Sequence, residues 1–167
     1  RTAIVGVQSS QRPQGDASGK PILESKAIQE IGKLTEARGY RQWNKKMKNA
    51  LEQTRRQSRG MLEVVEKLTE EEVIEFYSLN NCESYGEAII DLMMNVTQTA
   101  AEEREKWKEI ANNLNQDMWA IFCAKTDGEA EEKMDGCNQG EGLWAYLRIH
   151  QWFTRTTAQG MSLRRAA

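Results

Sequence analysis

The residues best suited to bind a metal ion are the three cysteines, Cys82, Cys123 and Cys137, and the single histidine, His150. Cys123, Cys137 and His150 are separated by 14 and 13 positions, and no Cys-x-x-Cys pair is present to hold zinc. Cys123 stands in an apolar stretch, which is typical of a core thiol. His150 is expected to be a partly buried, hydrogen-bonded helix residue near Trp152. We therefore expect neither a metal site nor a cofactor.

Two further patterns would indicate an enzyme if they were complete. Gly15 to Lys20 resembles part of a phosphate-binding loop, but the spacing is one residue short and Pro21 occupies the Ser/Thr position. A Ser-His-Asp arrangement would depend on the one histidine, and no Gly-x-Ser-x-Gly motif is present. The sequence predicts a protein without catalytic residues.

The clearest pattern is charge segregation between two successive segments. Residues 38–59 carry eight cations against one acid. The cations are Arg38, Arg41, Lys45, Lys46, Lys48, Arg55, Arg56 and Arg59. Residues 63–87 carry eight glutamates against one lysine, and the acidic surface is expected at Glu70, Glu71, Glu72 and Glu75. These four stand at a predicted helix start, where acids favour the helix dipole.

Three interpretations of this charge pattern stay open. The two segments neutralise each other across a helix hairpin, or they form a polar contact between identical subunits. In the third interpretation, the basic segment contacts the phosphates of RNA. The expected partners are therefore other copies of this chain or subunits of a larger complex, with RNA as a further candidate.

Composition limits the class of protein. The chain has 167 residues, which fits one domain, and a formal net charge of −2 excludes a globally basic nucleic-acid coat. The mean hydropathy is −0.73, and no apolar run approaches the roughly 18 residues that a membrane span needs. Three scattered cysteines form no disulfide framework and favour a reducing, intracellular compartment, first the cytoplasm and then an organelle.

Apolar spacing predicts an all-α fold of six or seven helices. Residues 1–21 have the composition of an extended or flexible arm, and residues 22–167 are expected to form a single helical domain that opens with a short lead-in. Seven helices are expected at 36–57, 61–68, 70–79, 85–114, 118–124, 130–134 and 143–153, and the residues from 160 onward have the pattern of another helix cut short. Thr69 with Glu72, and Thr126 with Glu129, have the form of a capping box, and Asp117 is predicted as an N-cap. We expect the C-terminal pattern to continue beyond Ala167 and the sequence, which opens with Arg1, to be part of a longer protein.

Large apolar residues at helical spacing are expected to anchor the core. Tryptophans can also stack on nucleic-acid bases, but their positions here favour a structural role. The predicted anchors are Trp43, Trp119, Phe122, Leu143, Trp144, Leu147 and Trp152.

Three strings, in order from Lys20 to the end of the chain, resemble the Gag proteins of copia-type LTR retrotransposons. Gly39–Trp43 is similar to the family's opening Tyr-x-x-Trp helix. Trp119 followed by Thr126–Ala130 resembles its Thr-x-Gly-x-Ala step. Gly140–Leu147, followed by Trp152–Arg155, resembles its aromatic helix and the turn after it.

The resemblance implies a helical, capsid-like domain that self-assembles and packages RNA, with no catalysis in this segment. The family's Cys-x-x-Cys-x-x-x-x-His-x-x-x-x-Cys knuckle is absent from this sequence. Two alternatives stay open beside the Gag-like structural protein. One is a helical subunit of a larger complex, held by its N-terminal arm, and the other is an RNA-binding module.

Overall fold

The computed structural model describes residues 19–166, and the side chains of residues 19–155. This part of the chain forms eight α-helices and two short 3-10 turns, and its one strand-like feature is an isolated bridge between Leu34 and Thr126. The all-α prediction is confirmed. The elements are η2 (Ile22–Glu24), α1 (Lys26–Gln29), α2 (Tyr40–Thr54), α3 (Ser58–Glu66), α4 (Glu70–Leu79), α5 (Tyr85–Val96), η3 (Ala101–Glu103), α6 (Arg104–Lys125), α7 (Gly128–Asp135) and α8 (Gly142–Ala166).

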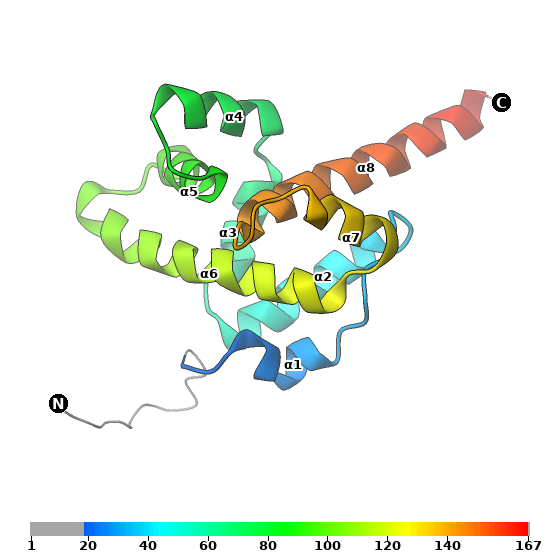
Figure 1. The fold of residues 1–167 in the computed structure, drawn as a ribbon, viewed down its shortest axis with the longest axis horizontal. Helices are drawn as coiled ribbons and strands as arrows, with labels where there is room; N and C mark the ends of the chain where they lie inside the picture. Colours follow the sequence, from blue (N-terminus) through cyan, green and yellow to red (C-terminus); the bar gives the residue numbers. More distant parts are fainter. Residues whose placement is uncertain (1–18, 167) are drawn as a thin grey trace.

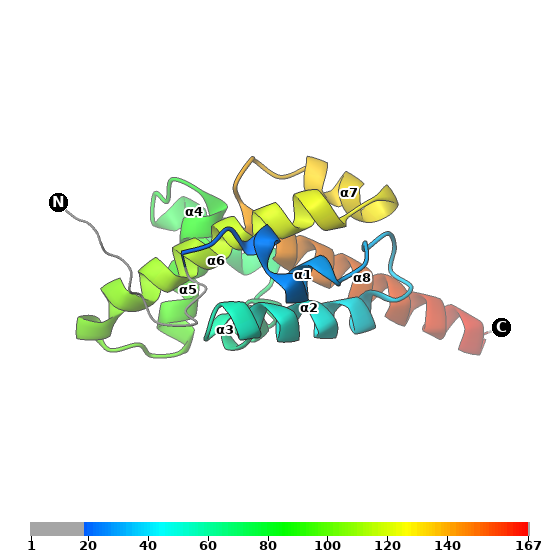
Figure 2. The same cartoon turned by 90° about the horizontal axis from the view of Figure 1, so that it is seen from below.

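The N-terminal half of α8 is the centre of the fold. Helices α3, α5, α6 and α7 pack against it, and the ring of Tyr40 on α2 meets the ring of Phe153 edge-on at 5.6 Å. Figures 1 and 2 show α8 entering between the other helices, with its C-terminal half extending beyond them. Its buried side chains include Leu143, Ala145, Tyr146, Leu147, Ile149 and Phe153. This burial on most faces is what the apolar run at 143–153 predicts.

The region expected as one helix from 85 to 114 contains a break. Helix α5 ends at Val96, Gln98 adopts a left-handed conformation with φ of 54°, and α6 begins at Arg104. The hydroxyl of Thr97 donates to the carbonyl of Met93 at 2.8 Å, and the amide of Thr99 donates to Met94 at 2.9 Å. These bonds satisfy carbonyls at the end of α5 and turn the chain toward α6.

Asp117 is inside α6 and is not an N-cap. Helix α6 continues through this position to Lys125, and the Asp117 carboxylate accepts from Nε of Arg55, the residue that follows α2, at 2.9 Å. The carboxylate that the sequence predicts as an N-cap therefore forms an ion pair with a distant part of the chain instead. The region predicted as two helices, 143–153 and 160 onward, is likewise one continuous helix, α8.

The two predicted capping boxes differ in outcome. At α4, the Thr69 hydroxyl accepts from the Glu72 amide at 3.1 Å, and Glu72 accepts from the Thr69 amide at 2.9 Å, which confirms the box. At α7 the N-cap is Asp127, whose carboxylate accepts from the Gly128 amide at 2.9 Å. The hydroxyl of Thr126 instead donates to the carbonyl of Phe122 at 2.6 Å.

The lead-in segment crosses the C-terminal end of α6. The Leu34 amide donates to the Lys125 carbonyl at 2.7 Å, and the Leu34 carbonyl accepts from the Asp127 amide at 3.0 Å. The Lys125 ammonium donates to the carbonyls of Gln29 and Ile31 at 3.2 and 2.8 Å. These bonds satisfy backbone groups where α6 ends and tie residues 29–34 to the rest of the fold. The predicted arm, 1–21, falls mostly outside the described residues, as does most of the Gly15–Lys20 pattern.

Five of the seven predicted anchors are buried: Trp43, Phe122, Leu143, Trp144 and Leu147. Trp119 is partly buried against the core. The prediction for Trp152 is wrong, because its side chain is 39% exposed. Its indole Nε1 donates to Glu129 at 2.7 Å, and the Lys133 ammonium lies 3.6 Å from the ring centroid. Polar contacts with α7 therefore hold this ring at the surface.

A glycine at the start of α8 allows that helix to approach α6. A Cβ at Gly142 would lie 2.2 Å from the Asn115 carbonyl oxygen and 2.4 Å from the Trp119 amide nitrogen. Both neighbours are backbone atoms of α6, so they cannot move aside as a side chain would. The side chain of Asn115 supports the same junction by accepting from the Leu143 amide at 2.8 Å.

We expect Gly142→Ala to lower the free energy of unfolding by at least about 2 kcal/mol, because the added methyl overpacks the junction of α6 and α8. Gly60→Ala is the matched control, since nothing lies within 4 Å of a Cβ at this position in α3. Helix propensity should make the control more stable than the native chain, by about 0.5 to 1 kcal/mol. Urea unfolding followed by circular dichroism measures both, and equal effects of the two substitutions would contradict the close approach.

Candidate functional site

Helix α2 carries an exposed cationic face. Its inner face, Tyr40, Trp43, Met47, Ala50 and Leu51, is buried. Arg41, Lys45 and Lys46 occupy the opposite side of the helix and are exposed, and Arg38 is exposed just before the helix begins. None of these four cations forms an ion pair with an acid among the residues that the structure describes. We call Arg38, Arg41, Lys45 and Lys46 the basic face.

Three of the predicted surface cations are used inside the molecule instead. Lys48 donates to Glu66 at 2.8 Å and lies 3.7 Å from Glu63, and Arg59 contacts Glu63 at 3.3 Å. Arg55 pairs with Asp117 on α6. The charges of α2 and α3 therefore neutralise each other in part. Lys48 of α2 pairs with Glu63 and Glu66 of α3, and the basic face has no such partner among the described residues. Arg56 is exposed at the turn between the two helices.

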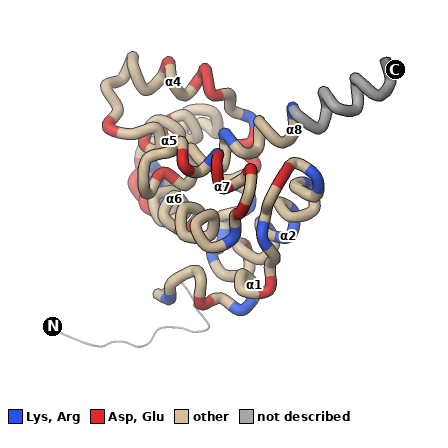
Figure 3. Tube along the Cα trace, turned by 45° about the vertical axis from the view of Figure 1, so that its right-hand side comes forward, with Lys and Arg blue, Asp and Glu red and all other residues tan. Residues whose placement is uncertain are grey.

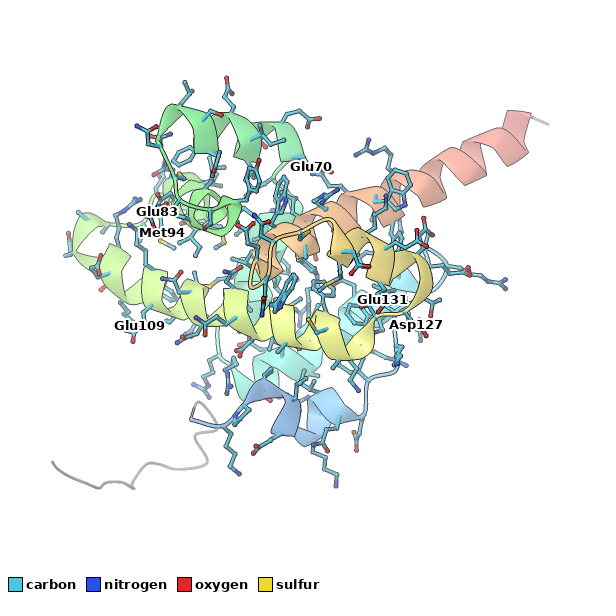
Figure 4. The ribbon with its side chains drawn as sticks, in the orientation of Figure 1. Glu70, Glu83, Met94, Glu109, Asp127 and Glu131 are labelled. Atoms are coloured by element: carbon cyan, nitrogen blue, oxygen red, sulfur yellow. The ribbon has the colours of Figure 1, made fainter. Side chains whose placement is uncertain are left out.

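Helix α4 carries the opposing acidic face. Glu71, Glu72 and Glu75 are exposed, and none pairs with a cation among residues 19–155. Glu70 differs, because it lies 3.9 Å from Arg148 of α8. Figure 4 shows Glu70 at the end of α4 that faces α8. We call Glu71, Glu72 and Glu75 the acidic face.

Two apolar side chains accompany these acids. Ile74 is 44% exposed and Leu79 is 75% exposed. Both follow Glu71 and Glu75 at helical spacing, so they share one side of α4. Val73 is the buried residue of this helix, which packs mainly on α5. The outward side of α4 therefore combines negative charge with uncovered apolar surface.

The basic and acidic faces are not in contact within one molecule. Helices α2 and α4 are not among the pairs of elements that pack closely. Figure 3 shows the acids of α4 at one end of the view and the cations of α2 on another side. Over such a separation, physiological salt screens most of the attraction between exposed charges. Within the part of the chain that the structure describes, both faces are exposed and could contact another molecule.

A buried polar cluster holds α2, α3 and α8 in register beneath the basic face. The carboxylate of Glu66 on α3 accepts from Lys48 at 2.8 Å, from Asn44 at 3.0 Å and from the Tyr146 hydroxyl. The Tyr146 hydroxyl also lies 2.7 Å from Asn44 Oδ1. Beside them, the Tyr40 hydroxyl and His150 Nδ1 are hydrogen-bonded at 2.7 Å.

The environment of this cluster fixes its protonation. Burial favours a raised pKa for Glu66, but the hydrogen bonds from Lys48, Tyr146 and Asn44 outweigh burial and lower that pKa from 4.5. Burial, reinforced by the charge of Glu66, raises the pKa of both Tyr40 and Tyr146 well above 10.0. The Glu66 carboxylate anion therefore binds the neutral phenol of Tyr146, the amide of Asn44 and the ammonium group of Lys48.

Burial also lowers the pKa of His150 from 6.5. The Glu66 carboxylate opposes this shift, and the positive charges of Lys48 and Arg41 add to it. His150 is thus a neutral, partly buried helix residue at pH 7, as expected. The spacing of Tyr40, Asn44 and Lys48 along one side of α2 is a signal that the charge analysis overlooked.

The cysteines and the histidine are not grouped at one site. Cys123 and Cys137 line one shallow cavity, together with Trp119 and Met134, while His150 is bonded to Tyr40 elsewhere. The prediction that Cys123 is a core thiol is wrong, because its side chain is exposed on α6. Among the described residues, no three His, Cys, Asp or Glu side chains are grouped to hold a metal ion.

Comparisons with protein-family models, curated proteins and solved structures find no match for this chain. Within residues 19–166, no helix has both the length and the apolar character that crossing a membrane would require.

Tyr146→Phe should lower the free energy of unfolding by about 1 to 3 kcal/mol, because it removes a donor from the buried Glu66 carboxylate. Tyr77→Phe is the control, since its hydroxyl makes no hydrogen bond within the described residues and its ring still packs on Tyr85. Chemical denaturation at pH 7 compares the two variants. If Tyr77→Phe were as costly as Tyr146→Phe, the cluster would not have the stabilising role assigned to it.

Stability should also fall as the pH is lowered below about 6.5. Because the pKa of His150 is lower in the folded state, the unfolded chain takes up a proton first, and the free energy of unfolding falls with it. His150→Gln keeps a hydrogen-bonding partner for Tyr40 and should remove this dependence. Thermal unfolding between pH 7.5 and 5.5 stays above the range where Glu66 titrates. The same pH slope in both chains would exclude His150 as its source.

Proposed function

We propose that this chain is a non-enzymatic structural protein that self-assembles, with the basic face of one copy against the acidic face of the next. The observation that carries the proposal is the outward side of α4. There Glu71 and Glu75 stand beside Ile74 and Leu79, and neither the charges nor the apolar groups are covered by described residues of the same molecule.

The basic face of α2 has the complementary chemistry. Arg41, Lys45 and Lys46 offer charged groups for the carboxylates, and their aliphatic stems can cover Ile74 and Leu79. The contact gains little from each exposed ion pair, so affinity depends on several pairs acting together with the apolar contact. Assembly should therefore be weak per contact, steep in protein concentration and weaker at high salt.

The two faces are different surfaces on one chain, so the contact is heterologous. Heterologous contacts join copies head to tail and build rings where the rotation closes, or open filaments where it does not. This geometry agrees with the capsid-like role that the Gag resemblance implies. The rigid placement of α2 by the buried cluster supports it, because a repeated contact requires a fixed angle between neighbours.

RNA binding is the second candidate function, and the unpaired cations of the basic face favour it. Phosphates would compete with the acidic face of α4 for the same four residues. An RNA-binding role predicts that the logarithm of affinity falls linearly with the logarithm of salt concentration, with a slope set by the phosphates contacted. Reversal of acids on α4 should leave such binding intact while it abolishes assembly.

Charge-reversed variants test the proposed contact. Lys45→Glu with Lys46→Glu, and separately Glu71→Lys with Glu75→Lys, should each raise the protein concentration needed for assembly at least about tenfold, because like charges then oppose each other. An equimolar mixture should recover assembly, since each variant offers the face that the other lacks. Light scattering at low salt follows the association.

Lys67→Glu with Lys106→Glu is the matched control. It makes the same change of net charge as Lys45→Glu with Lys46→Glu, at exposed lysines outside the basic face, and should assemble like the native chain. Circular dichroism verifies that every variant is folded. If the mixture stays dissociated while the control assembles, the pairing of α2 with α4 is incorrect.

A further inference from the structure

An apolar groove opens on the side of the molecule where α3, α5 and the start of α6 meet. Its volume is about 430 Å³, which is within the range of pockets that bind ligands. Met61 and Val64 of α3, Met93 and Met94 of α5, and Trp107 of α6 supply its apolar walls. Met94, labelled in Figure 4, lies on α5 toward the N-terminal part of α6.

The groove is separate from both charged faces. Its lining includes neither a cation of the basic face nor an acid of α4, and Glu103 is the one charged residue that lines it. Methionine side chains are flexible and adapt to irregular apolar partners. Its chemistry therefore suits a short apolar segment with a positive charge nearby.

The chain's own N-terminal sequence has this composition. Residues 1–18 lie outside the described residues, and their one apolar run is Ala3-Ile4-Val5-Gly6-Val7. Arg1 precedes the run and Arg12 follows it, which complements Glu103 at the groove. Apart from Pro13, residues 8–18 are polar, charged or small. The apolar content of the segment is therefore concentrated in residues 3–7.

The described chain begins close to this groove. The Lys20 carbonyl accepts from the Arg55 guanidinium, and Arg55 is in turn paired with Asp117 of α6 at 2.9 Å. Gln57, two residues after Arg55, lines the groove. Residues 8–19 can span up to about 40 Å, so the apolar run can reach the groove of its own molecule.

We propose that residues 3–7 bind in the apolar groove formed by α3, α5 and α6 of the same molecule. The short connection makes the binding intramolecular, with an effective concentration on the order of millimolar, so a contact of low intrinsic affinity suffices. The bound segment covers the partly exposed side chains of Val64 and Trp107 and packs on Met61, Met93 and Met94, which are already largely buried.

The methionine methyl groups provide a direct test in the full chain. With ¹³C-methyl methionine, Ile4→Ser with Val5→Ser should shift the NMR resonances of Met61, Met93 and Met94. Met47 and Met118, which are buried away from the groove, should not move and so report that the fold is unchanged. Gln8→Ser with Gln11→Ser is the control in the same segment, and it should leave all five resonances in place.

The spectra should be recorded across a range of dilutions. A shift that is independent of protein concentration supports binding within one molecule. A shift that develops only as concentration rises would mean that a second copy supplies the segment, and it would overturn the intramolecular arrangement. Unchanged groove resonances in Ile4→Ser with Val5→Ser would overturn the proposal altogether and leave the groove to an unrelated apolar partner.

Discussion

The junction of α8 with α6 is the constraint on which the rest of the structure depends. Gly142 lets the start of α8 lie directly against the backbone of α6, and the Asn115 side chain accepts a hydrogen bond from the Leu143 amide at the start of α8. From this fixed point α8 runs through the centre of the molecule and buries most of its faces. Helices α3, α5, α6 and α7 pack directly against that buried length.

The buried cluster around Glu66 fixes the orientation of α2 relative to α3 and α8. Tyr146 of α8 fixes Glu66 of α3, and Glu66 fixes Lys48 and Asn44 of α2. Helix α2 therefore has a fixed orientation with its remaining cations at the surface, whereas the side chains of Lys48 and Glu66 are only 13% and 17% exposed. Charges that neutralise each other inside the hairpin, such as Lys48 and Glu66, stabilise the fold, and those left over define the proposed assembly contact.

Local signals in the sequence predicted much of this fold. The spacing of Tyr40, Trp43, Met47 and Leu51 predicts α2 and its buried side, and Thr69 with Glu72 predicts the start of α4. The failures involve interactions between distant positions. Asp117 has the character of an N-cap, but Arg55, 62 positions earlier, binds it in the middle of α6. Trp152 has the character of a core residue, but Glu129 and Lys133 hold it at the surface.

The candidate surfaces were predicted only in part. Charge counting identified both segments, but it could not separate Lys48, Arg55 and Arg59, which are paired in the fold, from Lys45 and Lys46, which are not. That distinction depends on which side of each helix faces α3 or α6. The cluster was harder to predict, because Tyr146 and Glu66 are 80 positions apart and no local pattern links them.

Self-association of the native chain tests the central claim most directly. Size exclusion with light scattering, over a wide range of protein concentration at low and at high salt, measures the mass of the species in solution. The account predicts that mass rises with concentration at low salt and falls back toward 19.1 kDa at high salt. A mass of one chain at every concentration in low salt would contradict assembly through the basic and acidic faces.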